Sequence, residues 1–349
     1  MEAKLEKKEV SSSNKNTRKR RKRKLLLLLL LLFVTGTMLT TSTYAWFTAN
    51  ETVGVNTITV NIAAQNGIQV SADGTTWKSV VQTTDLTSVH ATTYKSSINQ
   101  IPATLEPVSS GLNVSSDGRL EMFHGQVVAD ADGNWILSSA PSVETESNGA
   151  TSTGKFVAFD LFFKSDTTTN LYMTSNSKVT TTDAADRGIK NATRVAYVIL
   201  GQTTATDTVA NIQKLGTENA TSSPVYMWEP NYNVHTEAAI AHARDTYGLD
   251  VSATQDSAVA YDGIIAEITA DAKVKVGEAN ATKHSTNFKT VTPSYKTIEG
   301  NATSTQIFGL EAGVTKVRIY MWVEGQDIDC ENAASGGNVS FDLQFSINA

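Results

Sequence analysis

Short runs of apolar and β-branched residues, separated by turn residues, recur through most of this chain. One pair of runs flanks residues 72–75 and another flanks residues 130–133. Each connecting segment contains an Asp-Gly step, which supplies the positive φ angles that a tight hairpin turn needs. The pattern therefore predicts two β-hairpins, one over 67–80 and one over 125–137.

Longer runs predict the central strands. Residues 156–163 are almost wholly apolar, which is typical of a strand covered on both faces. Residues 316–323 alternate, with Arg318 and Tyr320 on one face and aliphatic side chains on the other. Residues 339–347 alternate as well, and we expect these last two runs to pair as a hairpin across an acidic loop. The other predicted strands are 171–173 and 193–200.

The pattern weakens between residues 201 and 300, where Ala, Thr, Ser, Asn and Asp dominate and only 237–244 predicts a short helix. Strands with turn punctuation, without a regular strand–helix alternation, favour an all-β fold. We predict an antiparallel, jelly-roll-like β-sandwich made of 46–200 and 301–349. Residues 201–300 then form a loop-rich insertion, or a second small β-rich region, with at most short helices.

The first residues indicate export. Seven basic residues, 18–24, directly precede an apolar block at 25–34, as in the basic and apolar regions of a signal peptide. Small residues lead up to Ala45, so we predict cleavage between Ala45 and Trp46 and interpret 1–45 as the signal peptide. The alternative is an uncleaved anchor, but the block is short for a membrane span. The mature protein is then secreted, and only its leader touches the membrane before cleavage.

Charge and cysteine content narrow the possible partners. Residues 1–45 hold 11 of the 29 basic residues and 3 of the 35 acidic ones, which leaves the remainder with a net charge of −14. Such a chain repels nucleic acid and anionic lipid. Cys330 is the single cysteine, so no disulfide can form within the chain, and export without disulfides is typical of many Gram-positive bacteria. Its acidic neighbours should raise its pKa, which makes it a poor nucleophile.

The segment at the predicted cleavage site is distinctive. Residues 43–52 read Thr-Tyr-Ala-Trp-Phe-Thr-Ala-Asn-Glu-Thr, and 53–60 read Val-Gly-Val-Asn-Thr-Ile-Thr-Val. Over residues 18–62 the chain resembles the leaders cut by SipW-type signal peptidases, which end in a Thr-aromatic-Ala step followed by an aromatic residue. Ala49-Asn50 departs from the family, which often has an acidic residue there.

Secreted proteins with such leaders include the TasA and camelysin group of Gram-positive biofilm-matrix proteins. The resemblance implies a jelly-roll-like sandwich, processing by a SipW-type signal peptidase, and self-association or association with other matrix proteins. It also raises a camelysin-like metal-dependent peptidase as an alternative function. The segment 320–330 is similar to one in other secreted proteins that carry this leader.

The first strand of the mature chain has an apolar row of its own. Its orientation changes after Val55, so a β-bulge near residues 56–57 would reset the register. A free strand of this kind could complete the sheet of a neighbouring subunit, and repetition would give a fibre. The alternative is that it folds back into its own domain. The donor-strand candidates are Val53, Val55, Ile58, Val60 and Ile62.

Motifs for catalysis are missing from the sequence. None of the five histidines lies in a His-Glu-x-x-His motif, and no Gly-x-Ser-x-Gly elbow occurs. His235 and His242 are two helical turns apart and could share a face, but without a third ligand we interpret them as surface residues. We therefore expect no enzymatic activity.

Four carboxylates near the C-terminus are the main candidate metal site, because alternate acidic residues on a loop can wrap Ca²⁺. The spacing is not that of an EF-hand, and the alternative is a solvated turn. A weaker candidate is the turn at 130–134. We expect no other cofactor. The carboxylates are Glu324, Asp327, Asp329 and Glu331.

These patterns predict a secreted cell-surface structural protein, a candidate subunit of an extracellular matrix fibre assembled by strand exchange. The first alternative is a monomeric surface adhesin or carbohydrate-binding module, for which residues 228–232 offer an aromatic and polar patch. The second alternative is the camelysin-like metal-dependent peptidase, which the motifs do not support.

Overall fold

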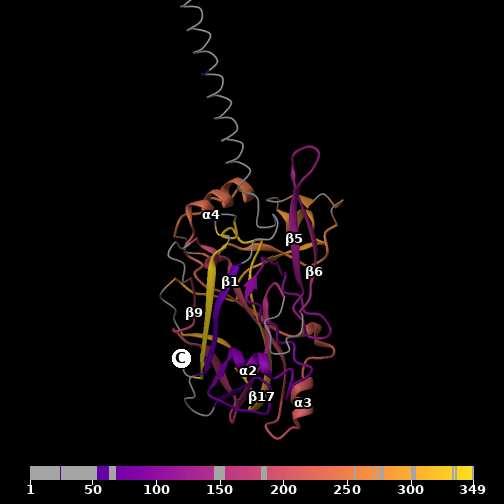
Figure 1. Ribbon diagram of the computed structural model, residues 1–349, viewed down its shortest axis with the longest axis vertical. Coiled ribbons are helices and arrows are strands. Elements are labelled where there is room, and N and C mark those ends of the chain that lie inside the picture. The colour runs from indigo at the N-terminus through magenta and orange to yellow at the C-terminus, as the bar shows by residue number, and fades with distance from the viewer. Residues whose placement is uncertain are drawn as a thin grey trace, which may run out of the picture. The chain divides into compact units, whose positions relative to one another are not determined.

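The computed structural model confirms the all-β class, with multiple antiparallel sheets and only short helices (Figure 1). None of the helices in the described part of the chain is long and apolar enough to cross a membrane. The predicted leader and cleavage site, apart from Lys24, lie outside that part. The structure describes residues 24, 53–62, 68–144, 154–181, 187–254, 257–269, 271–272, 274–275, 279–299, 304–331, 334 and 336–347.

Two large sheets form the sandwich, and we name them after their central strands. The β18 sheet has the order β16-β8-β18-β1-β3, with β4 also beside β1 and β9 also beside β18. Its strands are β1 (Val53–Ile62), β3 (Val80–Gln82), β4 (Thr104–Leu105), β8 (Thr169–Met173), β9 (Lys178–Thr180), β16 (Thr305–Leu310) and β18 (Asn338–Ser346). The β17 sheet has the order β15-β11-β10-β17-β7-β2. Its strands are β2 (Gln69–Ser71), β7 (Val157–Ser165), β10 (Thr193–Thr203), β11 (Val225–Glu229), β15 (Tyr295–Lys296) and β17 (Gly313–Val323).

Smaller elements complete the chain. One small sheet joins β5, β6 and β13, and another joins β12 and β14. Thr208 and Thr236 cap α3 and α4 by accepting a hydrogen bond from the backbone three residues later. The strands are β5 (Met122–Ala129), β6 (Trp135–Ser142), β12 (Tyr261–Ile264), β13 (Val274–Lys275) and β14 (Phe288–Val291). The helices are α2 (Thr83–Ser88), α3 (Val209–Lys214), α4 (Glu237–His242) and α5 (Asn280–Lys283), with shorter turns η2 (Ile189–Ala192), η3 (Ala220–Ser222) and η4 (Ala243–Tyr247).

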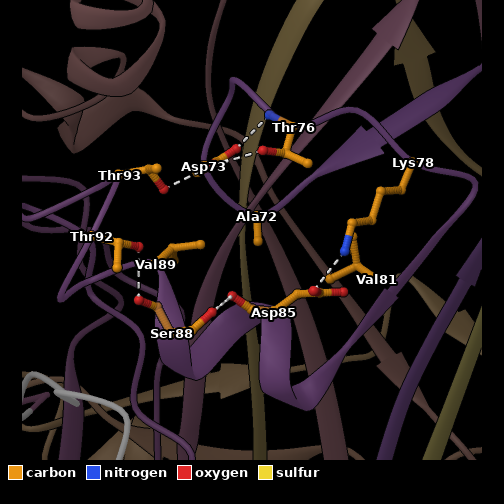
Figure 2. Close-up of a pocket in the computed structure, with 10 residues that line it drawn as sticks. All are labelled: Ala72, Asp73, Thr76, Lys78, Val81, Asp85, Ser88, Val89, Thr92 and Thr93. Carbon is orange, nitrogen blue, oxygen red and sulfur yellow. Dashed lines mark hydrogen bonds and ion pairs between the residues drawn. The ribbon is translucent and has the colours of Figure 1, made fainter.

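Both predicted turns form, but only one of them is followed by a full hairpin. β5 and β6 pair along their whole length around Gly133, whose φ is 79°, so this hairpin is confirmed. At the other turn only Val70 pairs with Lys78 before the chain crosses to β3 in the opposite sheet. That turn is held by the Asp73 carboxylate, which accepts hydrogen bonds from the backbone of the next residues (Figure 2).

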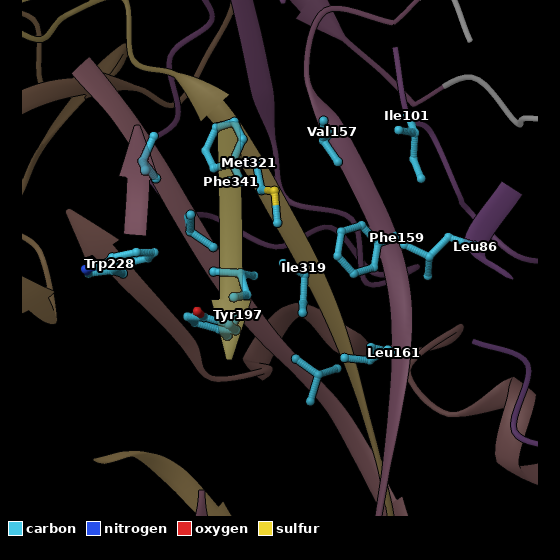
Figure 3. Close-up of a cluster of buried hydrophobic side chains, with 14 of the residues drawn as sticks. Leu86, Ile101, Val157, Phe159, Leu161, Tyr197, Trp228, Ile319, Met321 and Phe341 are labelled. Carbon is cyan, nitrogen blue, oxygen red and sulfur yellow. The ribbon is translucent and has the colours of Figure 1, made fainter. Parts of the chain in front are cut away.

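The core lies between the two large sheets. The odd-numbered side chains of β17, such as Ile319 and Met321, face Phe341 of β18 across the sandwich (Figure 3). Phe345 stands edge-on to Phe163 and Tyr197, with ring centroids 5.5 and 6.0 Å apart. The inward rows predicted for 316–323 and 339–347 are therefore confirmed, but as facing layers of one core.

The predicted pairing of these two runs is wrong, because β17 and β18 belong to different sheets. The alternation of apolar and polar residues predicts which side chains face inward, but it does not predict which strand lies beside them. The acidic loop therefore begins the connection from one sheet to the other.

The two sheets differ on their outer faces. β18 alternates between buried and half-buried residues, so one face of its sheet meets solvent. β17 and β7 are buried almost throughout, as predicted for 156–163. The outer face of the β17 sheet lies under a second apolar cluster that includes Val108, Leu120 and Tyr261. This covering layer buries polar side chains of β17 that a two-layer sandwich would expose.

The region 201–300 is less separate than the predicted division implies. It contains the short helix predicted over 237–244, as α4 and the turn that follows it. However, its strands β11 and β15 join the β17 sheet. The insertion therefore supplies two strands of the sandwich as well as part of the layer that covers it.

Candidate functional site

The strand with the donor candidates is paired within its own chain. β1 runs parallel to β18 from Gly54 to Ile62, and antiparallel to β3 and β4 on its other side. The register with β18 shifts between Val55 and Thr57, which confirms the predicted bulge. Of the two possibilities stated for this strand, the single chain shows the one in which it folds back into its own domain, where β18 pairs with it over most of its length.

β1 occupies an interior position in its sheet. It lies between β18 and β3, and it is the first strand among the described residues. Removing it would leave the edge of β18 open and would separate the short strands β3 and β4 from the sheet. The sheet thus contains a slot of defined register for one strand.

The acidic loop is buried, contrary to the interpretation as a solvated turn. Glu324 is fully buried, and Asp327, Asp329 and Glu331 are each less than a tenth exposed. The backbone amide of Glu324 donates to the carbonyl of Ala192, which ties the start of the loop to η2. The loop therefore brings four carboxylates into the protein, where each needs a partner.

Arg194 of β10 is the central cation of this region. It is fully buried, its Nη2 pairs with the Asp327 carboxylate, and the same nitrogen lies 2.9 Å from Glu229 Oε1 at the end of β11. Its guanidinium carbon lies 5.6 Å from the centre of the Tyr261 ring. One guanidinium thus serves two carboxylates from different parts of the chain.

The two histidines singled out in the sequence both face the acidic loop. His235 Nδ1 lies 2.9 Å from Asp329 Oδ2, and His242 Nδ1 lies 3.2 Å from the carbonyl oxygen of Ile328. Both side chains are buried, so the interpretation as surface residues is wrong. Helical spacing indicated a shared neighbourhood, but it could not show that the neighbour is a carboxylate far along the chain.

Glu324 is satisfied by neutral donors. Trp322 Nε1 donates to its Oε2 at 3.0 Å, and the backbone amide of Gln326 donates to its Oε1 at 3.0 Å. Burial nevertheless raises the pKa of Glu324 to about 7, against these hydrogen bonds and the charge of Arg194. A carboxyl can thus be fully hydrogen-bonded and still resist ionisation.

The charged neighbours of Arg194 behave similarly. Burial, reinforced by Asp327, raises the pKa values of Glu229 and Asp329 to about 7, although Arg194 opposes both shifts. Burial disfavours charge on His235, but the hydrogen bond that its Nδ1 donates to Asp329 and the charges of nearby carboxylates outweigh burial and raise the pKa of His235. We call the six residues the acidic cluster: Arg194, Glu229, His235, Glu324, Asp327 and Asp329.

The predicted calcium site is not formed. Among the described residues, no three His, Cys, Asp or Glu side chains converge on a point where they could hold a metal ion. Asp327, Asp329 and Glu324 instead bind Arg194, His235 and Trp322 respectively. At the weaker candidate, Asp130 accepts hydrogen bonds from Asn134 within its own turn.

A second buried charge group lies farther along the same outer face of the β17 sheet. Asp160 Oδ1 accepts a hydrogen bond from Arg318 Nε at 2.6 Å, and its Oδ2 accepts one from the Tyr94 hydroxyl at 2.7 Å. Lys316 Nζ lies 3.4 Å from the same carboxylate. We call these four residues the Asp160 cluster, and here two cations serve one acid.

The described part of the chain includes two cavities that open to the surface. One, of about 190 Å³, lies beside Asp73 and the ion pair between Lys78 and Asp85 (Figure 2). The Asp73 carboxylate accepts hydrogen bonds from two backbone amides of its own turn and from the Thr93 hydroxyl. The other is a polar groove of about 480 Å³. Its lining is Ser175, Asn176, Ser177, Lys178, Thr180, Pro230, Asn231, Thr297, Ile298, Asp342 and Gln344.

The remaining candidates are structural. Cys330 is buried and its pKa is raised well above that of a free thiol, first by burial and then by the acidic loop, as predicted. Trp228 and Glu229 are buried within the sheet, so the predicted surface patch at 228–232 is not formed. No protein-family model, curated protein or solved structure matches this chain.

Proposed function

We propose that this chain is a secreted cell-surface structural protein whose subunits assemble into an extracellular matrix fibre by exchanging β1. The observation that supports this is the place of β1. It is the first strand after the predicted cleavage between Ala45 and Trp46, yet it fills an interior position between β18 and β3. The resemblance of the leader to those of SipW-processed matrix proteins supports the same reading.

Exchange would preserve the contacts of the fold. A β1 strand from a neighbouring subunit can make the same ladder with β18 as the strand of the same chain, so the bonding is conserved. Repetition in one direction leaves a donor at one end and a slot at the other, which is the geometry of an open fibre. Assembly then depends on protein concentration and on the release of β1.

Export and processing are testable by themselves. The leader predicts that the mature protein begins at Trp46, and N-terminal sequencing of protein from the culture medium would show it. Recovery of the chain in the cytosol with Met1 intact would contradict the proposed location.

A reversible lock on β1 tests the assembly step. Asn61 of β1 is the register partner of Val80 of β3, so cysteines at these two positions are placed to form a disulfide within one chain. The lock is built on Cys330→Ala to avoid a third thiol. We expect the oxidised monomer to form no filaments by electron microscopy, and filaments to appear once the disulfide is reduced.

The matched control is a second cysteine pair away from the slot. Gln126 and Ser138 are register partners in the β5–β6 hairpin, and locking them should leave filament formation unchanged. Filaments of normal yield from the oxidised Asn61–Val80 lock would exclude strand exchange.

A monomeric carbohydrate-binding protein is the second candidate, and the polar groove of about 480 Å³ is the observation in its favour. Its hydroxyl, amide and charged side chains could hydrogen-bond a glycan. Binding of the oxidised, monomeric lock to a glycan array, abolished by Asn176→Ala with Gln344→Ala, would support this candidate.

A further inference from the structure

The acidic cluster is unbalanced when all of its carboxyls are ionised. Four carboxylates then face one guanidinium and an imidazole, and every one of these side chains is less than a tenth exposed. Buried charge without a partner is costly, so the closed loop and the ionised carboxyls oppose each other. Among the described residues no three His, Cys, Asp or Glu side chains are arranged to hold a metal ion, so protons are the simplest way to neutralise the excess negative charge.

Unpartnered atoms point to the same conflict. Glu229 Oε2, Asp329 Oδ1 and His235 Nε2 are buried and have no hydrogen-bond partner among the described residues. A carboxylate oxygen left in this state carries the full cost of desolvation. A proton on the carboxyl removes the charge, and a proton shared between Asp329 and His235 requires no other counter-ion.

We infer that the acidic cluster is a pH-sensitive latch: its protons hold the segment 324–331 closed between the two sheets, and losing them releases it. The segment is the connection from β17 to β18, so its release loosens the start of β18. The latch acts in the single folded chain and is independent of fibre assembly.

The groups that face the cluster come from every element around it. Arg194 stands on β10 and Glu229 on β11, and Tyr261 of β12 packs over Arg194. His242 of α4 contacts the loop backbone, and Glu331 and Cys330 lie in the loop itself. Arg194 is the one arginine or lysine in the acidic cluster, and protons on its carboxyls and on His235 reduce the excess negative charge that remains.

The direction of the pH effect follows from the pKa shifts. Glu229, Glu324 and Asp329 have pKa values of about 7 in the closed state, above those of exposed carboxyls. The closed state therefore binds more protons, and its stability falls as the pH rises from about 4 towards 7. The raised pKa of His235 acts in the same direction, because its stabilisation is lost as the pH rises through the folded pKa.

Cys330 supplies a probe inside the latch. It is the one thiol of the chain and is buried in the loop, so a thiol reagent reaches it only when the loop opens. The test measures labelling by a dithiodipyridine at about pH 5.5 and about pH 8, divided by the labelling rate in concentrated urea at the same pH. We expect protection at least about tenfold higher at the lower pH, since one group titrating over one pH unit gives tenfold.

The variant Glu229→Gln with Asp329→Asn removes the two charges and keeps the side-chain shapes. It should stay protected at about pH 8 and lose most of the pH dependence. The matched control makes the same chemical changes at exposed positions, Glu267→Gln with Asp132→Asn, and should behave like the unchanged chain. Equal protection at both pH values in the unchanged chain, or an unaltered dependence in the cluster variant, would overturn the latch.

A second measurement needs no variant that might misfold. Urea unfolding of the unchanged chain is measured at several pH values between about 5.5 and 8. The slope of the free energy of unfolding against pH gives the number of protons that the chain binds on folding. We expect the urea midpoint to fall as the pH rises. A midpoint that rises or stays constant would contradict the latch, because the folded chain would then bind no extra protons.

Discussion

The two buried charge clusters on the outer face of the β17 sheet respond to burial in opposite ways. Asp160 and Glu324 are equally inaccessible to solvent. Arg318 and Lys316 outweigh burial at Asp160 and lower its pKa, whereas burial wins at Glu324 and raises its pKa to about 7. The local ratio of cations to carboxyls, rather than depth, decides which buried acids ionise.

The ratio also affects the cations. Burial, with a contribution from Arg318, lowers the pKa of Lys316 to about 8 although Asp160 opposes the shift. Burial also disfavours the charge of Arg194, but the carboxylates of Glu229 and Asp327 outweigh it and raise the pKa of Arg194 above its usual range. In the Asp160 cluster the charge that burial disfavours on balance is that of Lys316, and in the acidic cluster it is that of Glu229, Glu324 and Asp329.

The largest expected effect is the loss of the single acid of the Asp160 cluster. Asp160→Ala leaves Arg318 and Lys316 buried without a counter-charge, and we expect a loss of about 3–5 kcal/mol in the free energy of unfolding. Urea titration at neutral pH measures it. A loss below about 1 kcal/mol would mean that solvent reaches the two cations and that the cluster is not sealed.

Removing one carboxylate from the acidic cluster should stabilise the protein at high pH instead of destabilising it. Glu229→Gln relieves carboxylate repulsion, so we expect a gain of about 1–2 kcal/mol in the free energy of unfolding at about pH 8 and little change at about pH 5.5. Paired urea titrations at the two pH values measure it. Destabilisation at both pH values would show that the ion pair between Glu229 and Arg194 contributes more to stability than the repulsion among the carboxylates takes away.

The hydroxyl of Tyr94 tests a neutral contribution to the Asp160 cluster. Tyr94→Phe removes the 2.7 Å hydrogen bond to Asp160 and keeps the ring against Phe162. We expect a loss of about 1–2 kcal/mol, which is typical of a hydrogen bond to a charged group. Thermal unfolding followed by circular dichroism suffices, and an unchanged midpoint would leave the two cations as the sole support of Asp160.

The smallest effect is expected at an exposed pair. Lys78 and Asp85 are 2.6 Å apart beside the smaller cavity, but both side chains are partly exposed. Asp85→Asn should change the free energy of unfolding by less than about 1 kcal/mol, and less in high salt. A loss as large as that of Asp160→Ala would break the link between burial and the strength of these charges.

Local patterns predicted local structure well. The Asp-Gly turns, the apolar strand at 156–163 and the bulge before Ile58 all depend on neighbouring residues, and the structure contains them. The partner of β17 depends on which sheet each strand joins. Alternation carries no information on that choice, so the predicted pairing with β18 was wrong.

The acidic loop shows the same limit for the site. Glu324 and Asp327 look like solvated residues until Arg194, far away in the sequence, is placed beside them. His235 likewise gains its role only from Asp329. The signal available was the unusual density of carboxylates next to a strongly apolar strand, which indicates either exposure or a buried counter-charge.

The parallel ladder between β1 and β18 has a consequence for biosynthesis. β1, the first strand among the described residues, completes its hydrogen bonds only with β18, the last of the described strands to be made. A chain threaded outward from its N-terminus therefore cannot close this sheet during transit, because long-range pairing is slow and requires the whole polypeptide. On the export proposed above, this sheet closes only after translocation has ended.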